Sequence, residues 1–318
     1  MRFETRKIYV SGTNSYILTL PKEWVESLGL KKGDIVFLEI RDNSLSIYPQ
    51  KRKKNFVCSI DDPKVTLKNL VRLIIAYYIA GFGTIKIKIY NEEQRTAVKS
   101  AIEMLMGAEI MEDLGDEMQI EIFLSLERFE INSVIEKMSE VILSMLKDYR
   151  ETAMVGFTGR QLDSVLLRES EVDRLYFLLL RLLTLAGREG LMTFFDTMNY
   201  RSTVKALERI ADHICRIFEV SNNAFLEEEV VRLVDALERL VRRTLVSFFK
   251  SDRKIADEVL EELEKITEHI NLLKEKFKED SRVKLQYQLL LSSLERIAGY
   301  LADIAEISID RNVLLAVQ

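Results

Sequence analysis

The sequence has little of what several protein classes require. Its 318 residues include two cysteines, Cys58 and Cys215, too few for a disulfide scaffold or a cysteine-based zinc site. Three prolines and twelve glycines leave few loop-rich stretches, which argues against extended disorder. Apolar runs such as residues 175–180 are much shorter than the ~20 residues that span a bilayer. The beginning, MRFETRKIYV, has no apolar signal-peptide core. We therefore expect a cytoplasmic protein without membrane insertion.

Motifs of common enzyme classes are also missing. The sequence has no Walker A motif, no Gly-x-Gly-x-x-Gly loop and no Gly-x-Ser-x-Gly elbow. The two histidines, His213 and His269, do not stand three residues after a glutamate, so the Glu-x-x-His signature of di-iron oxidases is absent. An enzymatic function would have to rest on carboxylates alone, and we expect a protein that is not an enzyme.

Charge is distributed unevenly along the chain. The formal net charge is −5, yet residues 1–54 contain eleven lysines and arginines against six aspartates and glutamates. The first 54 residues thus carry +5 and the remainder −10. This asymmetry predicts an anionic partner for the N-terminal segment and cations for the rest of the chain.

Residues 1–54 read as short strands around a brief helix. RKIYV, SYILTL, FLEI and LSIYP partly alternate in polarity, and LPKEWVESLGL places Pro21 in a first helical turn and Gly29 at its end. So small a unit buries little core, which favours pairing with a second copy. SYILTLPKEWVESLGLKKGDIVFLEI followed by LSIYP resembles the AbrB/SpoVT family of swapped-hairpin DNA-binding domains. The resemblance implies an interleaved dimer that presents basic residues to DNA.

The resemblance makes eight basic residues candidates for DNA binding. Such residues contact phosphates and position a protein on DNA without reading its sequence. The 51–54 run also reads as a charged linker, and all eight also fit ordinary solubility charges. The candidates are Arg2, Arg6, Lys7, Lys22, Lys51, Arg52, Lys53 and Lys54, of which Arg6 and Lys7 are the strongest.

Residues 55–126 predict a small α/β domain. A helix is expected over residues 62–81, and a second one begins near Asn91. The segments TIKIKIY and MQIEIFL alternate, so Ile85, Ile87 and Ile89 should share one face of a sheet. No catalytic motif occurs here, and a spacer, a second dimer contact and a ligand-sensing module all remain open.

Residues 127–318 predict six long helices in two three-helix repeats, about 127–223 and 224–318. Apolar residues recur there at spacings of three and four, typical of amphipathic helices. ALERIADHICRIFEVSNN at 206–223 aligns without gaps on SLERIAGYLADIAEISID at 293–310. We therefore expect a mainly α protein, its helical body preceded by a swapped-hairpin β domain (1–54) and an α/β domain (55–126).

Each repeat carries carboxylates four residues apart, which project from one face of a helix. Neighbouring pairs would form an anionic patch that demands a counter-cation, although such spacing also suits a solvated face. In the second repeat Gly299 stands where the aspartate of the last pair is expected. The predicted metal ligands are Glu169, Asp173, Glu208 and Asp212 in the first repeat, and Glu264, Glu268 and Glu295 in the second.

ESEVDRLYFLLLR and ALERIADHICRIFE resemble the PhoU family of phosphate-uptake regulators, and EKITEHI and SLERIAGYLADIAE match it more loosely. The resemblance covers roughly 130–316 and implies six helices that hold divalent or trivalent metal ions such as Fe, Zn, Mg or Mn. An AbrB-like segment before a PhoU-like body resembles archaeal phosphate-uptake regulators.

Three functions follow as hypotheses. The first is a DNA-binding transcriptional regulator of phosphate uptake, a homodimer or higher oligomer with a metal-binding sensory body. The second is a signalling adaptor that does not bind DNA and negatively regulates a phosphate ABC transporter or its sensor kinase; its partners would be transporter components or a sensor protein. The third and weakest is a metal-dependent hydrolase.

Overall fold

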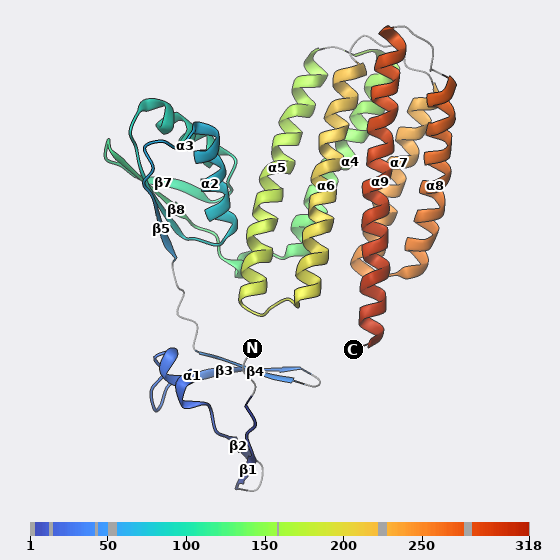
Figure 1. Cartoon of the computed structure of the whole chain (residues 1–318). Helices are drawn as coiled ribbons and strands as arrows, with labels where there is room; N and C mark the ends of the chain where they lie inside the picture. The colour runs from blue at the N-terminus through green and yellow to red at the C-terminus, as the bar shows by residue number, and fades with distance from the viewer. Residues whose placement is uncertain are drawn as a thin grey trace. The chain divides into compact units, whose positions relative to one another are not determined.

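The computed structural model describes residues 4–12, 15–41, 44–49, 56–157, 159–221, 228–276 and 282–317. The chain divides into two compact units, Met1–Asn55 and Phe56–Gln318. We call them the N-terminal unit and the main unit (Figure 1).

The N-terminal unit consists of two hairpins and a short helix. Strands β1 (Ile8–Ser11) and β2 (Ser15–Leu18) pair antiparallel, and so do β3 (Val36–Arg41) and β4 (Ser44–Pro49). Helix α1 (Lys22–Ser27) lies between the hairpins in the sequence. Its end is followed by Gly29 at φ +66°, a left-handed conformation that glycine adopts without steric cost. The predicted β domain with a brief helix is confirmed.

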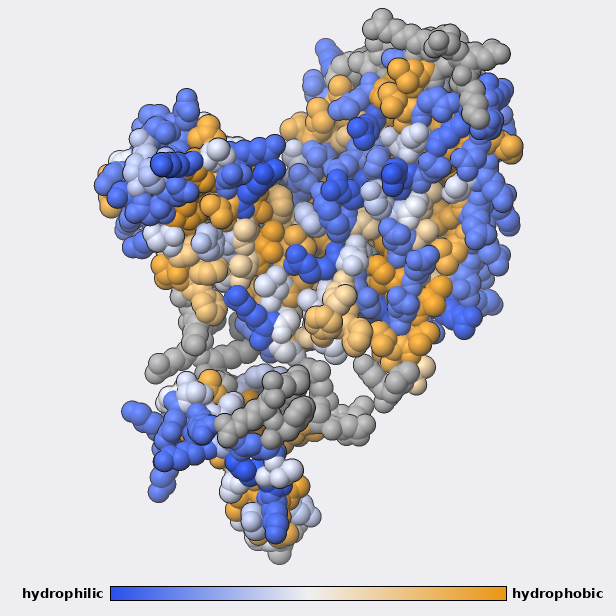
Figure 2. Space-filling view, in the orientation of Figure 1, coloured by the Kyte–Doolittle hydropathy of each residue, from blue (hydrophilic) through white to orange (hydrophobic). Residues whose placement is uncertain are grey.

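The apolar side chains of this unit remain on its surface. Ile8, Tyr16 and Ile40 are 68%, 76% and 82% exposed, and no residue of the unit whose burial is described is buried. Figure 2 shows hydrophobic surface on the first hairpin. One copy therefore leaves an unusual amount of apolar surface in water.

The main unit begins with a four-stranded sheet covered on one face by two helices. Its strands are β5 (Val57–Ile60), β6 (Thr84–Lys88), β7 (Ala108–Asp113) and β8 (Glu117–Ile122), in the order β5-β6-β8-β7. Only the β5–β6 pair is parallel, and helix α2 (Leu67–Ile79) makes the crossover between them. Helix α3 (Glu92–Glu103) follows β6.

The alternating segments bury the residues that their pattern predicts. Ile85, Ile87 and Ile89 are each at most 7% exposed, whereas Lys88 is exposed. The isoleucines pack against Leu70, Ile74 and Tyr78 of α2 and against Val98 and Ala101 of α3. The opposite face carries polar residues such as Lys86 and Gln119, so this layer has a small core of its own.

After the short helix η1 (Leu126–Arg128), the described chain contains six long helices. They are α4 (Ile131–Val155), α5 (Gly159–Arg188), α6 (Phe194–Ser221), α7 (Glu228–Lys250), α8 (Arg253–Lys276) and α9 (Arg282–Val317). They pack side by side as a bundle around one large hydrophobic core (Figure 1). The mainly helical fold class predicted from the sequence is confirmed. None of the described helices combines the length and apolar character that a bilayer-spanning segment needs.

The two repeats use equivalent buried hydrogen bonds. Ser221 and Ser308 occupy matching positions on the third helices, α6 and α9. The Ser221 hydroxyl lies 2.7 Å from that of Tyr149 on α4, and the Ser308 hydroxyl accepts a hydrogen bond from Ser247 on α7 at 3.1 Å. In each repeat a buried serine of the third helix thus contacts the first helix, as tandem three-helix units predict.

Helix α2 lies between the sheet and α5, so the α/β layer packs directly on the bundle (Figure 1). At this junction Arg181 of α5 is only 3% exposed. Its guanidinium donates hydrogen bonds to the carbonyl oxygens of Tyr78 and Phe82, at 2.6 and 2.8 Å, and lies over the Tyr78 ring. The arginine adds a charged donor to two carbonyls at and just beyond the end of α2, where helical hydrogen bonds run out; the Tyr78 carbonyl also accepts from the Gly81 amide at 3.0 Å.

Replacing this arginine should loosen the junction. In Arg181→Met the two carbonyls lose a charged donor, so we expect the free energy of unfolding to fall by about 3 kcal/mol. Chemical denaturation measures that loss, and amide hydrogen exchange should speed up in α2 more than in α6.

Arg188→Met is the matched control, since Arg188 is exposed and lies over the Phe56 ring without a described hydrogen bond. It should cost at most about 1 kcal/mol. Equal losses in the two variants would contradict the anchoring role of Arg181.

Candidate functional site

The four predicted ligands of the first repeat come together on the bundle surface. Glu169 and Asp173 lie one turn apart on α5, and Glu208 and Asp212 lie one turn apart on α6, which packs beside it. Electrostatic repulsion acts between the two pairs: Asp173 feels the charges of Glu169, Glu208 and Asp212. We call these four residues the acidic cluster.

Two members of the acidic cluster are paired with cations of α6. Lys205 donates to Glu208 at 2.7 Å, and Arg209 donates to Asp212 at 3.1 Å and lies 3.6 Å from Glu208. No hydrogen bond or ion pair is described for Glu169 or Asp173, and both are half-buried. The α5 carboxylates of the cluster therefore have no described ion-pair partner.

The pKa values reflect this imbalance. Burial raises the pKa of Asp173 to about 7, helped by repulsion from Glu169 and then from Glu208 and Asp212, while Lys205 opposes the rise. Burial and the charges of Asp212 and Glu208 also raise the pKa of Glu169. Carboxylates that resist ionisation in this way gain from a nearby cation.

The chemistry of the acidic cluster fits a hard or borderline metal ion, which prefers carboxylate oxygens. However, no three histidine, cysteine, aspartate or glutamate side chains among the described residues converge closely enough to hold one ion. A metal ion would therefore require Glu208 and Asp212 to turn away from Lys205 and Arg209 and toward α5.

The candidate ligands of the second repeat are arranged differently. Glu264 and Glu268 are exposed on α8, and Glu295 of α9 accepts a hydrogen bond from Lys274 of α8 at 2.6 Å. A β-carbon built on Gly299 would meet no atom within 4 Å, so crowding does not explain the glycine. The second repeat offers one carboxylate fewer, and a lysine from its own helix pair already holds Glu295.

The two histidines lie in different surroundings on α6 and α8. His213 is half-buried on α6 with its ring 5.9 Å from that of Tyr300 on α9, the residue at its matching repeat position. Burial lowers the pKa of His213, and the nearby Arg216 adds to this effect. A neutral ring against tyrosine indicates packing between the repeats. His269 is exposed on α8.

Three of the eight DNA-binding candidates lie in described parts of the N-terminal unit. Arg6 forms an ion pair with Glu4, and Lys22 of α1 lies 3.7 Å from Glu26. Lys7, just before β1, is exposed. Arg2, Lys51, Arg52, Lys53 and Lys54 lie outside the described residues.

The cations that accompany the acidic cluster are not among the residues predicted from the sequence. Arg201, Lys205 and Arg209 recur every four residues along α6, and the last two stand three residues before Glu208 and Asp212. This i,i+3 spacing places opposite charges on one helix face, so these ion pairs could have been predicted from the sequence.

Two segments of the chain match known family models. Residues 135–221 match the PhoU domain, and residues 9–55 match the model described as antidote-toxin recognition MazE, bacterial antitoxin. The chain thus joins a MazE/AbrB-like segment to a PhoU domain, and the two resemblances seen in the sequence are confirmed. The PhoU match includes all four residues of the acidic cluster.

Solved structures with a similar arrangement of helices include two PhoU proteins. The phosphate transport system regulatory protein PhoU from Streptococcus pneumoniae is 17% identical, with a TM-score of 0.47, over 58% of this chain and 95% of that chain. PhoU from Pseudomonas aeruginosa is 16% identical, with a TM-score of 0.47, over 59% of this chain and 96% of that chain. A search of curated proteins found no match.

The raised pKa of Asp173 predicts a dependence of stability on pH. Between pH 4 and 7 the folded chain holds a proton on Asp173 that the unfolded chain has released, so this residue lowers stability as pH rises through that interval. Asp173→Asn removes the effect. In EDTA the variant should match the wild type near pH 4 and exceed it by about 1 kcal/mol above pH 7, after allowance for solvent screening.

Denaturation in guanidinium chloride across this pH range measures the difference. Asp163→Asn is the control, because Asp163 is exposed on α5 outside the acidic cluster. A stability gain for Asp173→Asn that is the same at pH 4 and pH 8 would contradict the assignment.

Proposed function

We propose that the protein is a dimeric, DNA-binding regulator of phosphate uptake whose helical body responds to a bound metal ion. The PhoU match over 135–221 supports the link to phosphate, because the similar solved protein from Streptococcus pneumoniae is described as a phosphate transport system regulatory protein. The MazE match over 9–55 is compatible with DNA binding. Both segments are regulatory in kind, which favours a regulator over an enzyme.

The exposed apolar surface of the N-terminal unit carries the proposal of a dimer. Val10, Tyr16 and Leu38 are between 57% and 76% exposed although they lie on paired strands. Removing such surface from water is favourable by about 25 cal/mol per Å². A second copy supplies a matching surface, since a twofold interface pairs the same patch on both subunits.

A dimer also doubles the cations available to DNA. Lys7 is exposed without a described ion pair, while Arg6 can exchange Glu4 for a phosphate. Each phosphate that a cation neutralises releases counterions, which makes DNA binding depend on salt.

DNA binding should therefore need both the cations and the dimer. We expect the protein to bind its own promoter and phosphate-transport promoters tightly and in a salt-dependent way. It should bind random DNA more weakly. In Lys7→Gln the slope of log affinity against log salt should fall by about two, one for each copy. Ile40→Asp should reduce both dimer formation and DNA affinity, because Ile40 is 82% exposed on β3.

Fluorescence anisotropy measures DNA binding, and sedimentation equilibrium measures the oligomer. Lys64→Gln and Leu272→Asp are the matched controls, since both residues are exposed in the main unit. If wild-type protein binds promoter and random DNA equally, the operator-reading function is wrong and the adaptor hypothesis replaces it.

The acidic cluster is the proposed metal site. Glu169 and Asp173 would hold the ion on α5, and Glu208 and Asp212 would complete its ligands from α6. When bound, the ion neutralises the carboxylates that now lack a partner. For this, Lys205 and Arg209 would leave their ion pairs with Glu208 and Asp212. The distribution of charge on α5 and on α6 would then change together.

Metal binding should depend on Glu169 and not on the neighbouring carboxylate Glu171 of the same helix. We expect Mn²⁺ to raise the melting temperature of the wild type, because a ligand bound only to the folded state stabilises it. Glu169→Gln should weaken Mn²⁺ binding at least about tenfold. Glu171→Gln, on the same helix but paired with Lys137, should leave it unchanged.

Isothermal titration with Mn²⁺ separates the variants. Equal affinities for Glu169→Gln and Glu171→Gln, or no binding by the wild type, would exclude the acidic cluster as the site.

A further inference from the structure

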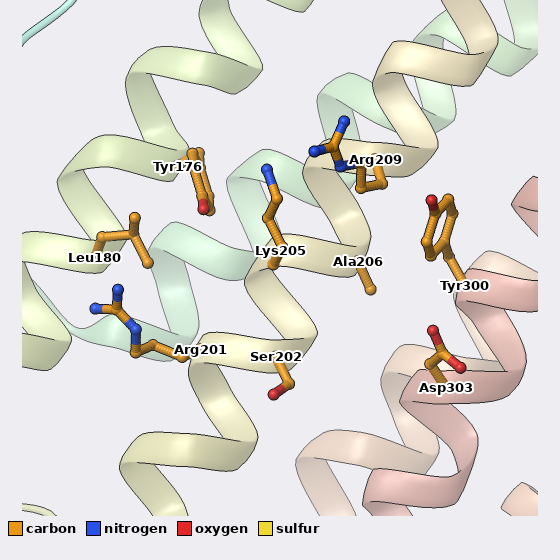
Figure 3. Close-up of a pocket in the computed structure, with 9 residues that line it drawn as sticks. All are labelled: Tyr176, Leu180, Arg201, Ser202, Lys205, Ala206, Arg209, Tyr300 and Asp303. Carbon is orange, nitrogen blue, oxygen red and sulfur yellow. The ribbon is translucent and has the colours of Figure 1, made fainter. Parts of the chain in front are cut away.

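Three cations of α6 lie along an open groove beside the acidic cluster. The groove has a volume of about 530 Å³ and is lined by Arg201, Lys205 and Arg209, with Tyr176 from α5 and Tyr300 from α9 on its flanks. Figure 3 shows Arg201 and Lys205 extending from α6 on the side of α5. Its volume is in the range of small-molecule binding sites.

The groove carries an excess of positive charge. Among its lining residues Asp303 of α9 is the single carboxylate against three cations, and Figure 3 shows Arg201 and Lys205 pointing to the other side of α6. No ion pair is described for Arg201. Lys205 and Arg209 are shared with Glu208 and Asp212, which lie outside the lining, and Lys205 also packs over the Tyr176 ring at 4.8 Å. Arg201 can thus bind an anion directly. Lys205 and Arg209 can do so when Glu208 and Asp212 release them.

The spacing of the cations favours an elongated anion. Arg201 and Arg209 are eight residues apart, or about 12 Å along a helix with a rise of 1.5 Å per residue. A single orthophosphate is too small to contact both. We propose that this groove binds a linear oligophosphate, either free or as the phosphate chain of a nucleotide, with Arg201, Lys205 and Arg209 as its ligands.

The same cations connect this groove to the acidic cluster. An oligophosphate competes with Glu208 and Asp212 for Lys205 and Arg209. Neutralising those carboxylates removes the competition, so a cation on the acidic cluster and an anion in the groove should favour each other. This coupling rests on the proposed metal site, whereas binding in the groove itself does not.

The test must avoid metal ions, because oligophosphates bind divalent cations themselves. Tripolyphosphate is titrated into the full chain in EDTA by isothermal calorimetry, and orthophosphate and ATP are titrated in parallel. The double substitution Glu208→Gln with Asp212→Asn stands in for the metal, since it neutralises the two carboxylates that hold the cations.

We expect tripolyphosphate to bind and orthophosphate to bind at least about tenfold more weakly. Arg201→Gln should weaken tripolyphosphate binding about tenfold, the loss of one charge-assisted contact. The double variant should bind about fivefold or more tightly than the wild type. Equal affinity for ATP would show that the phosphate chain alone is recognised, and tighter binding of ATP would add a contact to the nucleoside.

Two controls separate this groove from other basic surfaces. Arg128→Gln removes an exposed arginine from the short helix η1, and Lys64→Gln removes an exposed lysine from the turn before α2. Both should bind tripolyphosphate like the wild type. If Arg201→Gln also binds like the wild type, or if orthophosphate binds as tightly as tripolyphosphate, the proposal is wrong.

The result is independent of the proposed regulator. Loss of promoter preference or of Mn²⁺ binding would overturn those proposals and leave the calorimetry in EDTA unaffected. Weaker binding by the double variant would overturn the competition between carboxylates and oligophosphate even where Arg201 proves to be a ligand.

Discussion

The packing of α6 against α9 is the contact on which the rest of the bundle depends. These third helices of the two repeats pack on each other, and matching positions on them are buried, among them Ile210 and Ile297 and also Ala211 and Ala298, none more than 1% exposed. Because α6 has its buried stripe fixed by this contact, its charged residues are confined to the surface between α5 and α9. The acidic cluster and the groove both follow from that constraint.

Much of this arrangement could be predicted because it repeats in the sequence. The Leu-Glu-Arg-Ile-Ala match at 207–211 and 294–298 predicted equivalent helices, and residues such as Ile85 and Ile87 predicted a sheet face by strict alternation. The carboxylates of the first repeat came together because i,i+4 spacing fixes a helix face and neighbouring helices bring two faces into proximity. These are local rules, and local rules carry over from sequence to structure.

The remaining features depend on contacts between distant segments. Arg181 lies in an apolar run that predicts core, and only the position of α2 shows that it satisfies the Tyr78 and Phe82 carbonyls. Lys274 reaches Glu295 across 21 residues of sequence, a pairing that no spacing rule gives. The ion pairs of Lys205 and Arg209 do follow from spacing. The raised pKa of Asp173 on the neighbouring helix does not, because it depends on burial. Burial is a property of the packed bundle.

The difference between the two repeats has an electrostatic consequence. In the first repeat the cations and two of the carboxylates belong to the same helix, so their ion pairs can be exchanged by side-chain rotation alone. In the second, Lys274 joins α8 to α9, and Gly299 removes the carboxylate that would compete for it. If that ion pair breaks, Glu295 loses its lysine partner, and no second carboxylate stands beside it on α9 to bind a cation. The first repeat therefore pairs these charges within one helix, whereas the second uses an ion pair to join two helices.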